Sequence, residues 1–150
     1  MTEPSEITPT DLVMPVLGGF RVLVVAADAD SAASLAAVLR LRGFEANAAR
    51  TGAAALEAVA ADRPKVVVLD PELPDADGCD LIRRIRAAAG SPAVVVVTGE
   101  TSQALRLAVT AAGANACLLK PADPDRLVSL IGRLVDATAY VDLPDRTPRP

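Results

Sequence analysis

The strongest constraint on the fold is a set of short apolar runs that are not interrupted by polar residues. Such runs occur at Val22–Val25, Val66–Leu69, Val94–Val97 and Cys117–Leu119. A strand with one solvent-facing side shows alternation, so these runs indicate strands buried on both faces, as in a parallel sheet covered by helices. A fifth segment, Phe44–Ala48, alternates weakly and is typical of a more exposed edge strand.

Apolar residues at helical spacing separate these runs. The clearest set lies on one helix face, at spacings of i, i+3, i+4, i+7 and i+8: Leu127, Leu130, Ile131, Leu134 and Val135. Similar repeats occupy three other segments: Leu35–Leu39, Leu56–Ala60 and Leu105–Ala112. Strand and helix therefore alternate along the chain. Because crossovers between parallel strands are right-handed, we expect a doubly wound α/β sandwich of five strands and five helices.

Composition excludes several functional classes. The net charge of −4 and the lack of a basic stripe argue against direct binding of nucleic acid. No apolar run approaches the about 20 residues that a membrane span needs. The absence of histidine excludes Ser-His catalysis, His-ligated zinc and a role as phosphohistidine donor. The two cysteines lack CxxC spacing and fit a reducing compartment, so we expect a cytoplasmic protein.

We expect one domain at 20–137, between an N-terminal extension at 1–19 and a Pro-rich C-terminal tail at 138–150. Residues 1–19 lack the basic start of a secretory signal. Their apolar patch, Leu12–Leu17, is interpreted as a loosely packed lead-in, with docking on the domain or on a partner as the alternative. The C-terminal stretch has three prolines in the eleven residues from Tyr140 and is interpreted as a linker or frayed end.

Polar residues follow three of the predicted buried strands. In open α/β sheets, ligands bind outside the carboxyl ends of the strands, where the strand order reverses. Asp70, Thr98 and Lys120 stand at these ends and are predicted to bring a carboxylate, a hydroxyl and an ammonium group to one crevice. The first strand is instead followed by Ala26 and Ala27.

Three segments around these residues resemble the receiver domain of bacterial response regulators: VVVLDPELPDADG, VVVVTGE and GANACLLKP. The resemblance extends from about Arg21 to Val135. It implies a flavodoxin-like fold with strand order 2-1-3-4-5 and a cis Lys120–Pro121 bond. It also implies that Asp70 is the phosphoacceptor, that Thr98 is the switch hydroxyl and that Lys120 contacts the phosphoryl group.

The sequence departs from the family pattern at positions that matter for chemistry. Ala26 and Ala27 align with the acidic pair that holds Mg²⁺, and Cys117 aligns with the aromatic residue that moves with the switch hydroxyl. Cys117 is interpreted as a damaged switch position, or simply as a small apolar filler. Mg²⁺ needs oxygen ligands in near-octahedral geometry, so we expect no metal and no other cofactor.

Three carboxylates remain as weak candidates for a metal site: Asp70, Glu72 and Asp28. Asp28 would need a slip or bulge at the strand end to point at the metal, since side chains alternate faces, so we expect it to cap the following helix. Glu72 is the more interesting candidate, because the resemblance implies that its backbone lies beside the metal position.

These features predict an atypical receiver in a two-component phosphorelay that is not an enzyme, works without phosphorylation, and binds signalling proteins such as a histidine kinase or an effector. The resemblance implies that the surface of the fourth helix, fifth strand and fifth helix forms these contacts, or a homodimer. Two alternatives remain open. One is an active phosphoacceptor, in which Glu72 helps to hold Mg²⁺ beside Asp70. The other is a small-ligand sensor that uses the emptied crevice.

Overall fold

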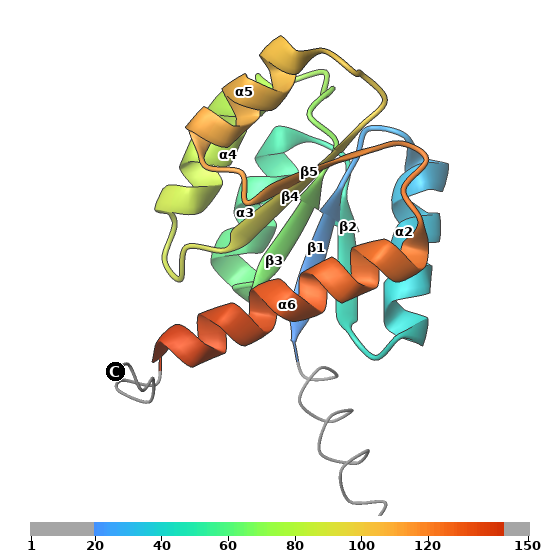
Figure 1. Cartoon of the computed structure of the whole chain (residues 1–150), viewed down its shortest axis with the longest axis vertical. Helices are drawn as coiled ribbons and strands as arrows, with labels where there is room; N and C mark the ends of the chain where they lie inside the picture. The colour runs from blue at the N-terminus through green and yellow to red at the C-terminus, as the bar shows by residue number, and fades with distance from the viewer. Residues whose placement is uncertain (1–19, 143–150) are drawn as a thin grey trace, which may run out of the picture.

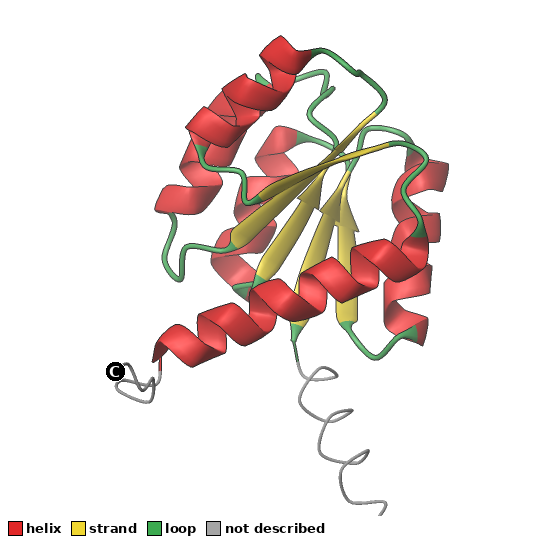
Figure 2. Ribbon diagram, in the orientation of Figure 1, coloured by secondary structure: helices red, strands yellow, loops and turns green. Residues whose placement is uncertain are grey.

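Five parallel strands form a central sheet, as Figures 1 and 2 show. The computed structural model describes residues 20–142, with side chains described as far as residue 135. The strands lie in the predicted order β2-β1-β3-β4-β5. Their bounds are β1 (Arg21–Val25), β2 (Glu45–Ala49), β3 (Val66–Leu69), β4 (Ala93–Thr98) and β5 (Ala116–Leu119). Every residue of β3 and β4 is buried, which confirms the interpretation of their uninterrupted apolar runs.

Helices cover both faces of the sheet (Figure 1). On one face lie α2 (Ala29–Leu41) and α6 (Pro124–Asp142), and on the other α3 (Gly52–Asp62), α4 (Gly78–Ala87) and α5 (Gln103–Ala112). Leu39 and Ile131 are fully buried on the first face, and Val59 and Ile85 on the second. The two apolar layers fix the sheet between them, so polar groups find room only at the strand ends.

Helix α6 extends past the predicted C-terminal boundary of the domain. It continues to Asp142, past the boundary expected at residue 137. Alanines at 137 and 139 favour helix, and the sequence has no proline between Pro124 and Pro144 to stop it. The N-terminal extension and the last part of the C-terminal tail lie outside the described residues.

Side-chain caps set the starts of the helices. The Asp28 carboxylate accepts a hydrogen bond from the Ser31 N–H at the start of α2, as predicted. Thr51, Asp77 and Ser102 cap α3, α4 and α5 in the same way. Each cap fixes where a loop from the carboxyl edge of the sheet ends and a helix begins.

The start of α4 lies against the loop that follows Asp70. A Cβ atom at Gly78 would lie 2.7 Å from the Cβ and 3.0 Å from the carbonyl oxygen of Pro71. Since non-bonded carbon atoms attract at about 3.5–4.0 Å and repel well inside that range, glycine is required for this approach. Gly78 therefore couples the position of α4 to that of the loop.

We expect Gly78→Ala to lower the free energy of unfolding by about 1–3 kcal/mol, although alanine favours helix, because the added methyl group overpacks the contact with Pro71. Gly99→Ala is the matched control, since a Cβ there would meet nothing within 4 Å. Urea unfolding followed by circular dichroism measures both variants. Equal stability of the two would contradict the assigned role of the Gly78 contact.

Candidate functional site

The predicted polar residues meet at the carboxyl edge of the sheet. Backbone hydrogen bonds fix their places: the Asp70 N–H donates to the carbonyl of Val25 at 2.8 Å, and the Lys120 N–H donates to the carbonyl of Thr98 at 2.8 Å. The Lys120–Pro121 bond that follows is cis, as the resemblance implies. The three strand ends thus hold Asp70, Thr98 and Lys120 as neighbours.

Lys120 forms an ion pair with Asp70. Its ammonium Nζ contacts Oδ2 of the carboxylate, while Oδ1 accepts a hydrogen bond from the Glu72 N–H at 3.0 Å. The Asp70 side chain is 16% exposed and that of Lys120 41%. Both oxygens of the predicted phosphoacceptor are therefore occupied by partners from the chain itself.

The Thr98 hydroxyl has a partner outside this pair. Its side chain is 2% exposed, and its hydroxyl oxygen accepts a hydrogen bond from the Glu100 N–H at 3.1 Å. Cys117, half-buried on β5, borders a small cavity of about 70 Å³ together with Thr98 and Leu119. Thr98 is thus connected to Lys120 through the backbone, while its hydroxyl supports the loop before α5.

The alanine pair brings a different environment to the end of β1. Ala26 is 7% exposed and packs in the apolar cluster beneath α2 and α6, with its N–H bonded to the carbonyl of Ala49 at 3.1 Å. The carbonyl of Ala27 accepts a hydrogen bond from Nε of Arg50 at 3.2 Å. A guanidinium group therefore lies beside the backbone of the alanine pair.

Asp28 is engaged as a helix cap. One of its oxygens accepts hydrogen bonds from the Ser31 hydroxyl at 2.6 Å and from the Ser31 N–H at 2.9 Å. These bonds, together with the positive charges of Arg50 and Lys120, hold the pKa of Asp28 below its ordinary value of 3.8. Asp28 follows the carboxyl end of β1, and its carboxylate already has its hydrogen-bond partner in Ser31.

The donors at this edge do not fit Mg²⁺. Asp70 is bonded to Lys120 and to the Glu72 N–H, Asp28 caps α2, and the Glu72 side chain is exposed. Among the described residues, no group of three or more His, Cys, Asp or Glu side chains is placed to hold a metal ion. Mg²⁺ demands near-octahedral oxygen ligation and gives up water reluctantly, so a lone, already paired carboxylate is a poor site.

A further acidic residue, Asp75, fixes the loop between β3 and α4. Its carboxylate accepts hydrogen bonds from the N–H groups of Gly52 at 2.8 Å and Ala53 at 3.1 Å, at the start of α3. These bonds hold the pKa of Asp75 below its ordinary value of 3.8. No local pattern predicts this contact, because it depends on α3 and the loop meeting in space.

A sheet of order β2-β1-β3-β4-β5 with Asp70, Thr98 and Lys120 at its carboxyl edge matches one known family. The family model described as the response regulator receiver domain matches residues 22–132. The chain belongs to this family. The assignment makes it a signalling domain of the two-component type and supports a non-enzymatic role.

Receiver-containing relatives and structures agree with the assignment. The chain is 39% identical over 115 residues to the transcriptional regulatory protein PrrA of Mycobacterium tuberculosis, covering 77% of this chain and 49% of that protein. It is 38% identical over 111 residues to the DNA-binding response regulator MtrA of Mycobacterium leprae, covering 74% of this chain and 49% of that protein.

A CheY-like receiver domain protein from Methanospirillum hungatei superposes with a TM-score of 0.76 at 26% identity, covering 81% of this chain and 97% of that one. The chain spans about half the length of the curated relatives it matches. No helix among the described residues is long and apolar enough to cross a membrane.

We expect Asp75→Asn to lower the melting temperature at pH 7 and to have less effect as the pH falls. A carboxylate whose folded pKa lies below its ordinary value of 3.8 stabilises the fold above that pH, and this contribution is lost as the pH falls through the folded pKa. Thermal melts between about pH 7 and pH 2.5 measure the gap between the two proteins. Asp30→Asn, at an exposed acid of α2, is the control. A gap that stays constant down to the lowest pH would contradict the role of the Asp75 carboxylate.

Proposed function

We propose that this chain is an atypical receiver that signals through protein contacts without phosphorylation of Asp70. The observation that carries the proposal is the replacement of the acidic pair by Ala26 and Ala27, with Lys120 already on the remaining carboxylate. Arg50, bonded to the Ala27 carbonyl, adds a second fixed positive charge at the same edge.

Phosphoryl transfer to an aspartate depends on positioning and on neutralising the charge of the transferring oxygens. Lys120 can supply one positive charge, but its ammonium group is held by Asp70. An attacking Asp70 oxygen would have to leave either Lys120 or the Glu72 N–H before it met a phosphoryl group. These bonds favour a crevice whose charges stay paired within the chain. They disfavour the alternative, a phosphoacceptor assisted by Glu72.

The polar groups of the crevice are bonded to one another, which disfavours the small-ligand sensor as well. Asp70 and Lys120 satisfy each other, and the Thr98 hydroxyl bonds the loop before α5. Protein contacts through the helical faces are then the remaining mode of action. The partner surface expected from the resemblance is made of α5, β5 and α6. A kinase, an effector or a second copy of the chain is the proposed class of partner.

Incubation with acetyl phosphate and millimolar Mg²⁺ should leave the intact mass of the protein unchanged. The reason is that, in the part of the chain that the structure describes, no group of three or more His, Cys, Asp or Glu side chains is placed to hold the ion beside Asp70. An ordinary receiver in the same reaction is the positive control. A gain of one phosphoryl group that disappears in Asp70→Asn would overturn the proposal and favour the phosphoacceptor assisted by Glu72.

We expect the double variant Ala26→Asp, Ala27→Asp to bind Mg²⁺ at millimolar concentration and to form an acyl phosphate on Asp70. Without metal it should lose about 1–4 kcal/mol of stability, because new carboxylates crowd the edge and position 26 is buried. Arg50 should offset part of this loss, because its guanidinium group lies beside position 27.

Melting temperature with and without Mg²⁺, together with intact mass, measures both effects in the double variant. Ala33→Asp, at an exposed site on α2, controls for added charge. Asp70→Asn in the double variant should abolish the mass gain. A double variant that neither binds Mg²⁺ nor gains mass would place the defect in the loop around Pro71 instead of in the two side chains.

A further inference from the structure

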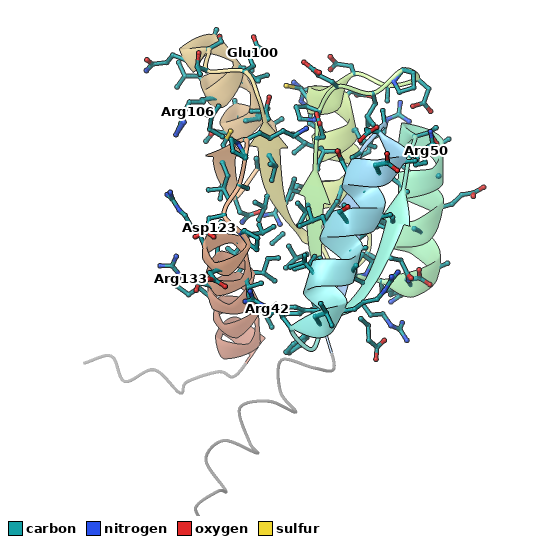
Figure 3. The ribbon with its side chains drawn as sticks, turned by 90° about the vertical axis from the view of Figure 1, so that its right-hand side faces the viewer. Arg42, Arg50, Glu100, Arg106, Asp123 and Arg133 are labelled. Atoms are coloured by element: carbon teal, nitrogen blue, oxygen red, sulfur yellow. The ribbon has the colours of Figure 1, made fainter. Side chains whose placement is uncertain are left out.

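Helix α5 is part of the proposed partner surface, yet its own side chains anchor it weakly. In Figure 3, Arg106 of α5 and Arg133 of α6 lie along one side of the molecule, the side of this surface. Val109 and Ala112 are the buried residues of α5, whereas Leu107 is 63% exposed. Helix α4 is also ten residues long and buries three large side chains: Leu81, Ile82 and Ile85. Because the hydrophobic effect scales with the apolar area removed from water, burial holds α5 less firmly than α4.

The turn after α5 is tied to the start of β4 by Asn115. The Asn115 N–H donates to the Val94 carbonyl at 2.7 Å, and Oδ1 of Asn115 accepts a hydrogen bond from the Val94 N–H at 2.8 Å. Val94 is fully buried, in a strand whose six residues are all buried. The two bonds therefore connect the C-terminal end of α5 to a part of the sheet that is itself fixed.

Arg86 of α4 makes a second connection to the same end of α5. Its Nη1 donates to the carbonyls of Ser91 at 3.2 Å and Pro92 at 3.0 Å, in the loop before β4. Its aliphatic stem lies against Gly113, the C-cap of α5, where a Cβ atom would be 2.9 Å from Cγ of Arg86. Gly113 also has a φ of +122°, which L side chains rarely adopt. Arg86 thus joins α4, the start of β4 and the end of α5.

The N-terminal end of α5 is held at the other end of β4. Residues 99–102 connect the strand to the helix, and the Thr98 hydroxyl accepts a hydrogen bond from the Glu100 N–H in this loop. The Ser102 hydroxyl then caps α5 by accepting a hydrogen bond from the Leu105 N–H at 3.2 Å. Both ends of α5 are therefore tied to one buried strand.

We propose that Arg86 and Asn115 form a clamp that keeps α5 in one position on the sheet and so presents the α5–β5–α6 surface to partners in a single arrangement. The inference rests on the proposed function, because the surface that the clamp fixes is the partner surface named there. Arg86 suits this role because α4 is anchored by its own buried side chains and by the contact of Gly78 with Pro71. Partners then meet a preformed surface that needs no change at Asp70.

Hydrogen–deuterium exchange of the full chain, measured by mass spectrometry, tests the clamp. Arg86→Ala and Asn115→Ala should each speed exchange of the α5 amides about tenfold relative to the α2 amides of the same molecule, because α5 can then open without global unfolding. Arg83→Ala is the matched control for Arg86→Ala, since Arg83 is an exposed arginine of the same helix. Asn115→Asp should keep exchange slow, because a carboxylate oxygen can still accept the bond from the Val94 N–H.

The thiol of Cys117 gives a second measurement. Cys117 lies on β5, packs against the apolar cluster that includes Val109 of α5, and borders two cavities, of about 300 Å³ and about 70 Å³, that Arg106 also lines. In a Cys79→Ser background, opening of α5 should expose this thiol. Both alanine variants should therefore react with iodoacetamide about tenfold faster, followed by intact mass, while the Arg83→Ala and Asn115→Asp proteins should not.

Two results would overturn the proposal. One is equal acceleration of exchange in α2 and α5 together with a lower melting temperature, because the two residues would then support the whole fold and not the position of α5. The other is α5 exchange and Cys117 reactivity that stay at the level of the original chain in either alanine variant. Neither measurement uses a phosphodonor, so its result is independent of the acetyl phosphate experiment on Asp70.

Discussion

Burial of β3 and β4 on both faces is the constraint on which the rest of the structure depends. With α2 and α6 on one side and α3, α4 and α5 on the other, no side chain of these strands reaches solvent before the strand ends. Polar chemistry is therefore confined to the residues just past the carboxyl ends, where Asp70 and Lys120 meet. The loop after Asp70 is in turn held by two helix starts, through Gly78 against Pro71 and through Asp75 on the N-terminus of α3.

The same edge shows how the chain balances charge without an acidic pair. Lys120 is neutralised by Asp70, and Asp28 lies within the electrostatic reach of both Lys120 and Arg50. Two cations and two anions thus lie at this edge of the sheet, each with at least one hydrogen bond or ion pair to the chain. A doubly charged metal ion at this edge would be repelled by Arg50 and Lys120. A crevice rich in carboxylates would attract the same ion.

Local signals in the sequence predicted most of the fold and the centre of the site. Uninterrupted apolar runs identified the buried strands, and the residues after them included Asp70, Thr98 and Lys120. Arg50 was not predicted, because an arginine after an edge strand looks like any solvated side chain until the fold brings it to the Ala27 carbonyl. The contact of Asp75 with Gly52 was missed for the same reason: both bonds join segments more than twenty residues apart.

The proposed departures from the family pattern lie at two different places in the fold. Ala26 and Ala27 flank the crevice, whereas Cys117 borders the cavities beneath Arg106. Thr98 lies between these two places. Its backbone carbonyl accepts a hydrogen bond from the Lys120 N–H, and its side chain borders the smaller cavity. Its hydroxyl oxygen accepts a hydrogen bond from the loop before α5. Cys117 borders open space at one of these places, and at the other Lys120 is paired with Asp70. On the proposed function, control of the α5–β5–α6 surface therefore rests on what binds there and not on a change at Asp70.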